Sequence, residues 1–186
     1  MRSLKLETPH AIVVIGIQGS GKTFFAEKFA ETFNTPFIEE AMFTGLSRDE
    51  KTGRSMMQKI LAETLKTKSS IVIESALSSK ADRQELVKVL KKAGYETLFI
   101  WVQVDTDTAA SRSRRSSGIS ESDYIKRMKQ FAQPESYEQA LVISGKHTFA
   151  TQVKAVLKRL TSSPRPPLHK PIERPAASQR NRVIVR

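Results

Sequence analysis

The chain has 186 residues, of which 39% are hydrophobic and 27% charged, enough for one globular domain with a substantial core and too few for two ordinary domains. It contains no cysteine, so disulfide bonds and thiolate metal sites are excluded. The formal net charge of +12 favours polyanionic partners such as nucleic acid or an anionic membrane surface, and a solubility role accounts for it equally well. No apolar stretch is long enough to span a bilayer, and we expect a cytoplasmic protein.

Strand and helix patterns alternate along the chain. The predicted strands are short apolar or β-branched runs at residues 11–15, 36–40, 70–75, 97–104 and 140–144. The predicted helices repeat apolar residues at helical spacing, as Phe24, Phe25, Phe29 and Phe33 do in the first, and cover residues 22–33, 49–66, 79–94 and 148–160. We expect a loop between the second strand and the second helix. This alternation predicts a parallel sheet with helices on both faces.

Two segments depart from this pattern. Residues 105–133 are polar and rich in arginine, and we expect two short helices there that form a lid. Residues 161–186 hold five prolines and six basic residues against one acid, Glu173, and are predicted to be disordered because they bury little apolar surface. This tail therefore carries six minus one, or +5, of the net charge of +12. We predict one domain over residues 1–160, followed by the tail.

The stretch GIQGSGKT, Gly16 to Thr23, follows the first predicted strand, opens the first predicted helix and matches the pattern G-x-x-x-x-G-K-[ST]. Its glycines let backbone N–H groups turn toward phosphate oxygens, and the helix N-terminus adds the positive end of its dipole. We expect Lys22 to reach the β- and γ-phosphates and the Thr23 hydroxyl to bind Mg²⁺. The predicted nucleotide-binding residues are Gly16, Ile17, Gln18, Gly19, Ser20, Gly21, Lys22 and Thr23. With this loop, the pattern predicts a P-loop NTPase of three layers around a five-stranded parallel sheet, with ATP as the nucleotide.

Acidic residues end two of the predicted strands. Glu74 ends the third, at the carboxyl edge where α/β sheets bind ligands, and is a candidate to hold Mg²⁺ through a water beside Thr23, with a solvated acid at the strand end as the alternative. Glu39 and Glu40 end the second, and a carboxylate there is a candidate to accept the proton of an acceptor hydroxyl. Since successive residues of a strand face opposite sides, only one of the two faces the cleft. We favour Glu40, with a plain surface role for both as the alternative.

Basic residues gather in the predicted lid. Arg112 and Arg115 lie three apart, so on a helix they share a face and are candidates to clamp one phosphate group, whereas Arg114 points elsewhere. A solvated basic helix is the alternative. Three more basic residues follow in the same segment: Lys126, Arg127 and Lys129. Outside the lid, Arg83 is a candidate substrate contact or an exposed residue of its helix.

These motifs together resemble the P-loop kinases of the polynucleotide-kinase and zeta-toxin type, a group of small AAA-type kinases, over residues 11–160. The matching features are the P-loop, FIEE at the second strand, VIES at the third, and a lid segment with Asp105, Arg112, Arg115, Ser120, Tyr124, Arg127, Phe131, Pro134 and Glu138. The resemblance implies that Glu39 or Glu40 is the acceptor-side base, and that Arg112 and Arg115 bind the ATP phosphates and the transition state. It also implies that adenine lies near the loop after the last strand, at Ser144, Gly145 and Lys146.

Three functions follow from these features. The first is an ATP- and Mg²⁺-dependent kinase that phosphorylates a hydroxyl, with a nucleic-acid 5′-hydroxyl as the first-ranked acceptor because a basic lid and tail suit a phosphate backbone. The second keeps the chemistry and replaces the acceptor by a small molecule such as a nucleoside, a sugar nucleotide or an antibiotic. The third is an ATP-gated switch that binds nucleic acid or protein and transfers no phosphate.

Overall fold

The structure is a computed structural model that describes residues 4, 6–75, 79–117 and 120–162. The tail predicted at 161–186 lies outside the described residues from position 163 onward. No helix within the described ranges is both long and apolar enough to cross a membrane.

The centre of the fold is a five-stranded sheet in which all neighbouring strands run parallel, in the order β2-β3-β1-β4-β5. Its strands are β1 (His10–Ile15), β2 (Phe37–Glu39), β3 (Ile71–Glu74), β4 (Glu96–Gln103) and β5 (Leu141–Ser144). The five predicted strands and their parallel arrangement are therefore confirmed. Because every strand points the same way, all five carboxyl ends meet at one edge of the sheet, where α/β folds bind their ligands.

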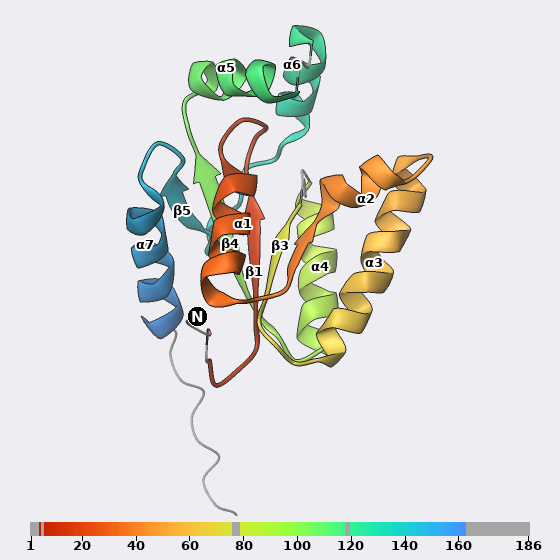
Figure 1. Cartoon of the computed structure of the whole chain (residues 1–186), viewed down its shortest axis with the longest axis vertical. Helices are drawn as coiled ribbons and strands as arrows, with labels where there is room; N and C mark the ends of the chain where they lie inside the picture. The colour runs from red at the N-terminus through yellow and green to blue at the C-terminus, as the bar shows by residue number, and fades with distance from the viewer. Residues whose placement is uncertain (1–3, 5, 76–78, 118–119, 163–186) are drawn as a thin grey trace, which may run out of the picture.

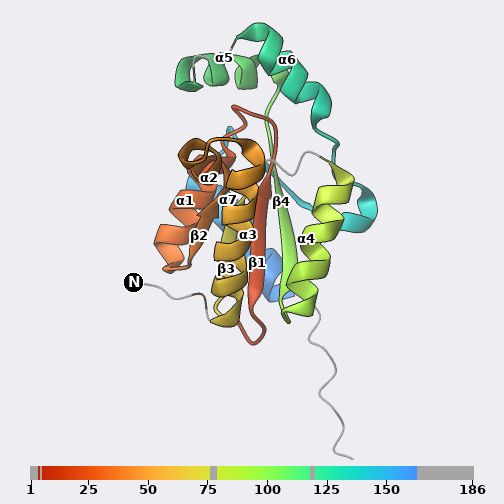
Figure 2. The ribbon, with the colours of Figure 1, turned by 90° about the vertical axis from the view of Figure 1, so that its right-hand side faces the viewer.

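Helices cover both faces of the sheet, which gives three layers (Figures 1 and 2). On one face, α1 (Lys22–Phe33) and α7 (Phe149–Ser162) pack with Ile12 and Val14 of β1. On the other, α3 (Glu50–Lys66) and α4 (Lys80–Lys92) pack with the alternate residues of the same strand, Val13 and Ile15. This follows from the continuous apolar run of β1, because alternate side chains of a strand enter opposite cores.

The predicted lid consists of two helices above the carboxyl edge of the sheet, α5 (Thr106–Ser117) and α6 (Glu121–Gln130) (Figure 1). Each begins at a side chain that accepts a backbone N–H of its first turn: Asp105 Oδ1 accepts from Thr108 at 2.8 Å, and Ser120 Oγ from Asp123 at 3.1 Å. The chain then returns to β5 through a short 3₁₀ helix, η1 (Ser136–Glu138). The prediction of two short helices is confirmed.

The prediction of a loop after the second strand is wrong. The strand ends at Glu39, and residues Glu40–Leu46 form a helix, α2, that packs against α3. The close packing depends on Gly53 of α3, where an added Cβ would lie 2.9 Å from the Cα of Thr44. A helix of seven residues is too short to be stable alone, so tertiary packing decides its formation and periodicity could not reveal it.

Arg83 of α4 is neither exposed nor in the predicted site. It is fully buried, and its Nε and Nη2 donate to the two carboxylate oxygens of Glu138 at 2.7 and 2.9 Å. Nη1 donates to the carbonyl oxygen of Ala132 at 2.9 Å, and Nη2 also to that of Gln133 at 3.4 Å. Arg83 therefore anchors the segment between α6 and β5 to α4.

Candidate active site

The loop at residues 16–21, called the phosphate loop below, lies between β1 and α1, with the lid helix α5 directly above it. Gly19 and Gly21 have φ angles of 82° and 98°, which favour glycine. A Cβ at Gly19 would lie 2.1 Å from the carbonyl oxygen of Ala109 in α5. The loop and the lid thus pack backbone against backbone, a contact that glycine alone permits.

Lys22 forms an ion pair with the carboxylate that ends β3. Its Nζ lies 3.4 Å from Glu74 Oε1, and the Glu74 side chain is only 6% exposed. Burial raises the pKa of Glu74, the ion pair with Lys22 opposes this rise, and the nearby charges of Glu39 and Glu40 add to it. Parallel pairing explains the arrangement, because Glu74 is in register with Val14 of β1 and with Glu39 of β2.

Glu39 and Glu40 occupy different positions at the same edge. Glu39 is the last residue of β2, whereas Glu40 is the first residue of α2. The hydroxyl of Ser75, which directly follows β3 and is buried, donates to Glu40 Oε2 at 2.5 Å. This bond links the Glu40 carboxylate, which follows β2, to the end of β3. Strand alternation in the sequence did not reveal this difference between Glu39 and Glu40.

The oxygen groups near Lys22 suit a magnesium ion bound together with phosphate. Thr23 and Glu74 offer a hydroxyl and a carboxylate, which are hard oxygen ligands. Within the described residues, no cluster of three or more His, Cys, Asp or Glu side chains forms a metal cage. The donor set therefore fits Mg²⁺ in its usual role beside phosphates, where nucleotide oxygens and waters supply most of the ligands.

The two predicted lid arginines differ in their contacts. Arg112 Nη1 donates to the carbonyl oxygen of Gly145 at 3.1 Å and lies 3.9 Å from where a Cβ of Gly21 would be. Arg115, one turn further along α5, is exposed, and its side chain forms no hydrogen bond or ion pair with another described residue. From α6, Arg127 Nη1 donates to Gln18 Oε1 of the phosphate loop at 3.2 Å. The structure thus brings Arg112 and Arg127 to the loop. Helical spacing within α5 could not indicate Arg127, because Arg127 belongs to α6.

The loop after β5 closes the other side of the site. A Cβ at Gly145 would lie 2.0 Å from the carbonyl oxygen of Ser20, so this loop touches the phosphate loop. Lys146 pairs with Asp105 at the start of α5, and this partner lowers the pKa of Asp105. A cavity of about 590 Å³ opens beside them, lined by Ile17, Trp101, Gln103, Asp105, Met128, Phe131, Ser144 and Lys146 among others. The residues predicted near adenine therefore lie next to the phosphate loop.

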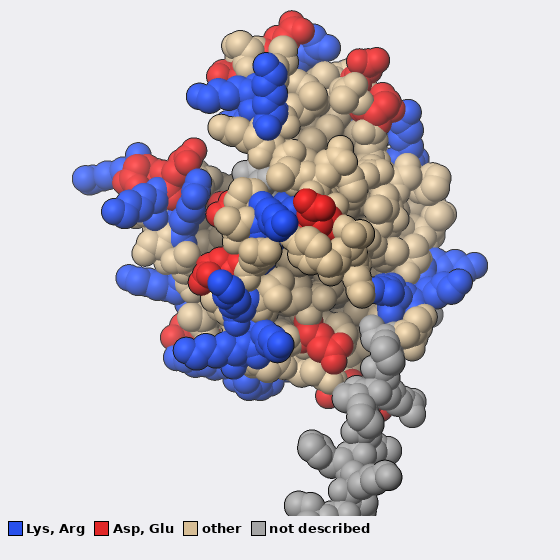
Figure 3. Space-filling model, turned by 180° about the vertical axis from the view of Figure 1, so that it is seen from behind, with Lys and Arg blue, Asp and Glu red and all other residues tan. Residues whose placement is uncertain are grey.

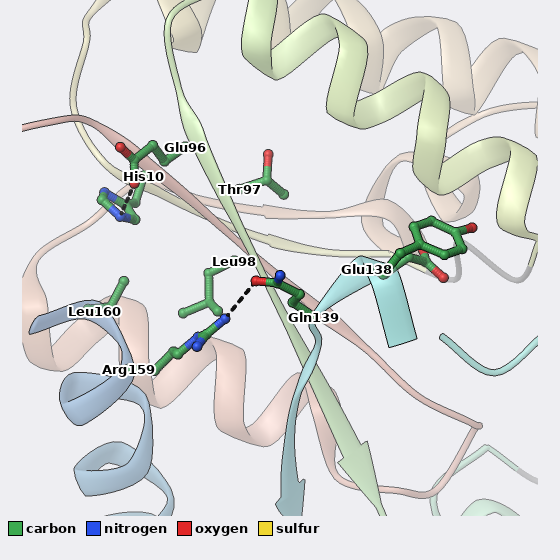
Figure 4. Close-up of a pocket in the computed structure, with 9 residues that line it drawn as sticks. His10, Glu96, Thr97, Leu98, Glu138, Gln139, Arg159 and Leu160 are labelled. Atoms are coloured by element: carbon green, nitrogen blue, oxygen red, sulfur yellow. Dashed lines mark hydrogen bonds and ion pairs between the residues drawn. The ribbon is translucent and has the colours of Figure 1, made fainter. Parts of the chain in front are cut away.

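A second cavity, of about 390 Å³, lies at the opposite, amino-terminal edge of the sheet (Figure 4). Its walls include His10, whose Nε2 lies 3.3 Å from Glu96 Oε2, and Arg159, whose Nη2 donates to Gln139 Oε1 at 3.2 Å. None of the residues that line it belongs to the predicted site. The predicted site residues therefore lie at the carboxyl edge and outside this cavity.

Comparison with known proteins shows which family and which folds the chain resembles. Residues 12–141 match the family described as AAA domain (AAA_33). A gluconokinase from Sinorhizobium meliloti 1021 superposes with a TM-score of 0.63 at 20% identity, over 84% of this chain and 94% of that one. Kti12 from Chaetomium thermophilum, solved with ADP-AlF3, gives 0.62 at 17% identity, over 81% and 97%. No curated protein matches the chain in sequence.

A third structure, that of the Pnkp1/Rnl/Hen1 RNA repair complex, superposes with a TM-score of 0.57 at 18% identity, over 73% of this chain and 47% of the other. At these identities the likeness establishes the fold, which is that of P-loop kinases. The fold and the phosphate loop thus define a P-loop nucleotide-binding protein. More particularly, the chain belongs to the AAA_33 family of AAA domains, and its resemblance to P-loop kinases is confirmed at the level of the fold.

Proposed function

We propose that this protein is an ATP-dependent phosphotransferase that moves the γ-phosphate to a hydroxyl group. The observation that carries the proposal is the convergence of three groups at one edge of the sheet. These are the Lys22–Glu74 pair at the phosphate loop, Arg112 of the lid, and a carboxylate held by Ser75 on the acceptor side. A cation at the phosphates, a second cation on a lid and a carboxylate for the acceptor are the parts that phosphoryl transfer needs.

Each group has a defined task in this proposal. Lys22 moves from Glu74 to the phosphate oxygens, and Arg112 neutralises charge on the transferred group. Glu40 accepts the proton of the acceptor hydroxyl while the hydroxyl oxygen of the acceptor forms a bond to the γ-phosphorus. The bond between the γ-phosphorus and the β–γ bridging oxygen breaks, and ADP leaves. When bound, Mg²⁺ would be held by the Thr23 hydroxyl and, through water, by Glu74, and would offset phosphate charge.

Support for the acceptor comes from charge and from the structural relatives. The net charge of +12 suits a nucleic-acid 5′-hydroxyl, as does the likeness to Pnkp1 in an RNA repair complex. Seen from behind, lysine and arginine side chains extend over the lid and along both sides of the molecule (Figure 3). The superposition on a gluconokinase favours a small hydroxylated acceptor as the second candidate.

The test is transfer of γ-labelled phosphate from Mg·ATP to 5′-hydroxyl RNA and DNA, nucleosides, sugar nucleotides, gluconate and hydroxylated antibiotics, with Lys22→Ala as the blank. Label on an oligonucleotide 5′-end supports the first-ranked acceptor, and label on a small molecule supports the second. Release of label only as free phosphate contradicts a kinase and favours an ATP-gated switch.

Two matched variants test the assignment of the base. We expect Glu40→Gln to lower kcat at least ~100-fold, the effect typical of losing a general base, with little change in ATP affinity. Glu39→Gln tests the neighbouring carboxylate in the same assay. A larger loss of kcat in Glu39→Gln than in Glu40→Gln reverses the assignment.

A further inference from the structure

The amino-terminal half of β4 extends past the edge strand that lies beside it. β5 pairs with β4 only from Ile100 onward, so among the described residues Glu96–Phe99 have a neighbouring strand on one side alone, which is β1. The N–H of Glu96 points to that side and donates to the carbonyl oxygen of the residue before β1 at 3.0 Å. Because backbone groups of successive strand residues point to opposite sides, those of Thr97 and Phe99 point to the other, open side. β4 therefore carries a short length of unpaired sheet edge.

This open side borders the second cavity, of about 390 Å³ (Figure 4). The cavity is lined by Glu96, Thr97 and Leu98 of β4, and Leu98 forms an apolar wall with Leu160 of α7. The side chain of Glu96 is 46% exposed and adds a carboxylate. Backbone groups of a sheet edge, with pockets for alternate side chains, are the features that bind an extended peptide segment as an added strand.

The chain itself contains a segment that fits these features, Val183–Arg186, with the sequence VIVR. Three β-branched residues in a row are typical of a strand, and the four residues of this segment equal the four unpaired residues of β4 in number. The segment belongs to the stretch that follows α7, which ends at Ser162, two residues after the cavity wall at Leu160. The twenty residues from 163 to 182 span up to about 65 Å when extended, so they can return the segment to the cavity.

We propose that Val183–Arg186 binds in the second cavity as an added strand, antiparallel to Glu96–Phe99 of β4. In this direction Arg186 lies opposite Glu96, where the two charges attract, and Ile184 lies opposite Leu98 on the same face of the sheet. The backbone of the segment then pairs with the backbone groups of β4 that point to the open side. A parallel arrangement would place Val183 opposite Glu96 and would lose this charge pair.

The proposed strand would hold the linker between α7 and the segment at both of its ends. This linker, residues 163–182, carries five of the six basic residues of the tail: Arg165, Lys170, Arg174, Arg180 and Arg182. Docking thus turns a basic tail into a basic loop at the amino-terminal edge of the sheet. Four strand residues make few contacts, so their release is a local opening that leaves the melting temperature of the domain unchanged and is detected by backbone exchange.

The first measurement is hydrogen exchange of single backbone amides by NMR in the full chain. The test variant is Ile184→Asp/Val185→Asp, because aspartate is disfavoured in strands, and the matched control is Ala176→Asp/Ala177→Asp, which adds the same charge within the linker. We expect the test variant to speed exchange of the Thr97 amide at least about fivefold and the control to change it less than about twofold.

The second measurement places a spin label beside the segment. The chain contains no cysteine, so Arg182→Cys gives a single labelling site. We expect the label to broaden the amide signals of Phe99 and Leu160, and to do so equally after dilution, because the contact forms within one chain.

Three results would overturn the inference. The first is an equal exchange rate of the Thr97 amide in wild type and in both variants. The second is a change at Val142 in place of Thr97, because the amide of Val142 faces the outer side of β5. The third is a broadening that disappears on dilution, which would assign the cavity to the segment of a second copy. The cavity lies at the edge opposite the candidate active site, so phosphoryl transfer or its absence leaves this inference unaffected.

Discussion

The buried ion pair between Arg83 and Glu138 permits a sharp test of what holds the lid to the core. Arg83 is fully buried and the Glu138 side chain is 5% exposed, so Glu138→Gln leaves a buried guanidinium without its countercharge. Removing one partner of a buried pair costs about 3–5 kcal/mol. Arg83 retains the carbonyl oxygens of Ala132 and Gln133, so we expect the lower end, about 3 kcal/mol. In a chain of this size that lowers the melting temperature by roughly 6–12 °C.

The dependence on pH separates this electrostatic loss from a packing defect. Hydrogen bonds from Arg83 lower the pKa of Glu138 below its ordinary value of 4.5. A carboxyl group with a lowered pKa stabilises the fold fully above 4.5 and loses that contribution as the pH falls through its pKa in the folded state. In denaturant unfolding, the difference between wild type and Glu138→Gln should therefore stay constant near neutral pH and shrink below about pH 4.

Glu63→Gln is the matched control for this measurement. Glu63 pairs with Lys66 at 2.7 Å, but the two side chains are 69% and 71% exposed, and such pairs contribute at most about 1 kcal/mol. A cost of Glu138→Gln no greater than that of Glu63→Gln would refute the reasoning. A difference between wild type and Glu138→Gln that persists unchanged in acid would refute its electrostatic part.

Three further predictions concern two glycines and the C-terminal tail. Gly145→Ala would bring a Cβ within 2.0 Å of the Ser20 carbonyl oxygen, so the phosphate loop must shift, and calorimetry should show Mg·ATP affinity at least ~10-fold lower. Gly45→Ala has no atom within 4 Å of the added Cβ and lies inside α2, so it should raise the free energy of unfolding by about 0.5–1 kcal/mol in urea titrations. Deletion of residues 163–186 should leave the melting temperature unchanged and, if the acceptor is nucleic acid, raise KM for an oligonucleotide and flatten its dependence on salt.

The sequence by itself determined most of the fold. Five strands and the four longer helices that alternate with them follow from hydrophobic periodicity, because burial of an apolar face obeys a period of two or 3.6 residues. The two short lid helices were expected from the polar, arginine-rich segment between the last two strands. The glycine loop between the first strand and the first helix was equally legible, since its glycines and Lys22 are neighbours along the chain, and its binding of phosphate stays a prediction.

Tertiary structure alone decided which distant side chains meet. Helix α2 forms because it packs on α3 at Gly53, and such packing leaves no local signal. The sequence allows Arg83 either as a substrate contact or as an exposed residue of its helix, yet Glu138, 55 residues away, makes its burial possible. Likewise, the sequence around Arg127 does not indicate its hydrogen bond to Gln18, and the sequence around Ser75 does not indicate its hydrogen bond to Glu40. Local periodicity reports which face of an element is buried, whereas the partner of a polar group depends on how the elements pack in space.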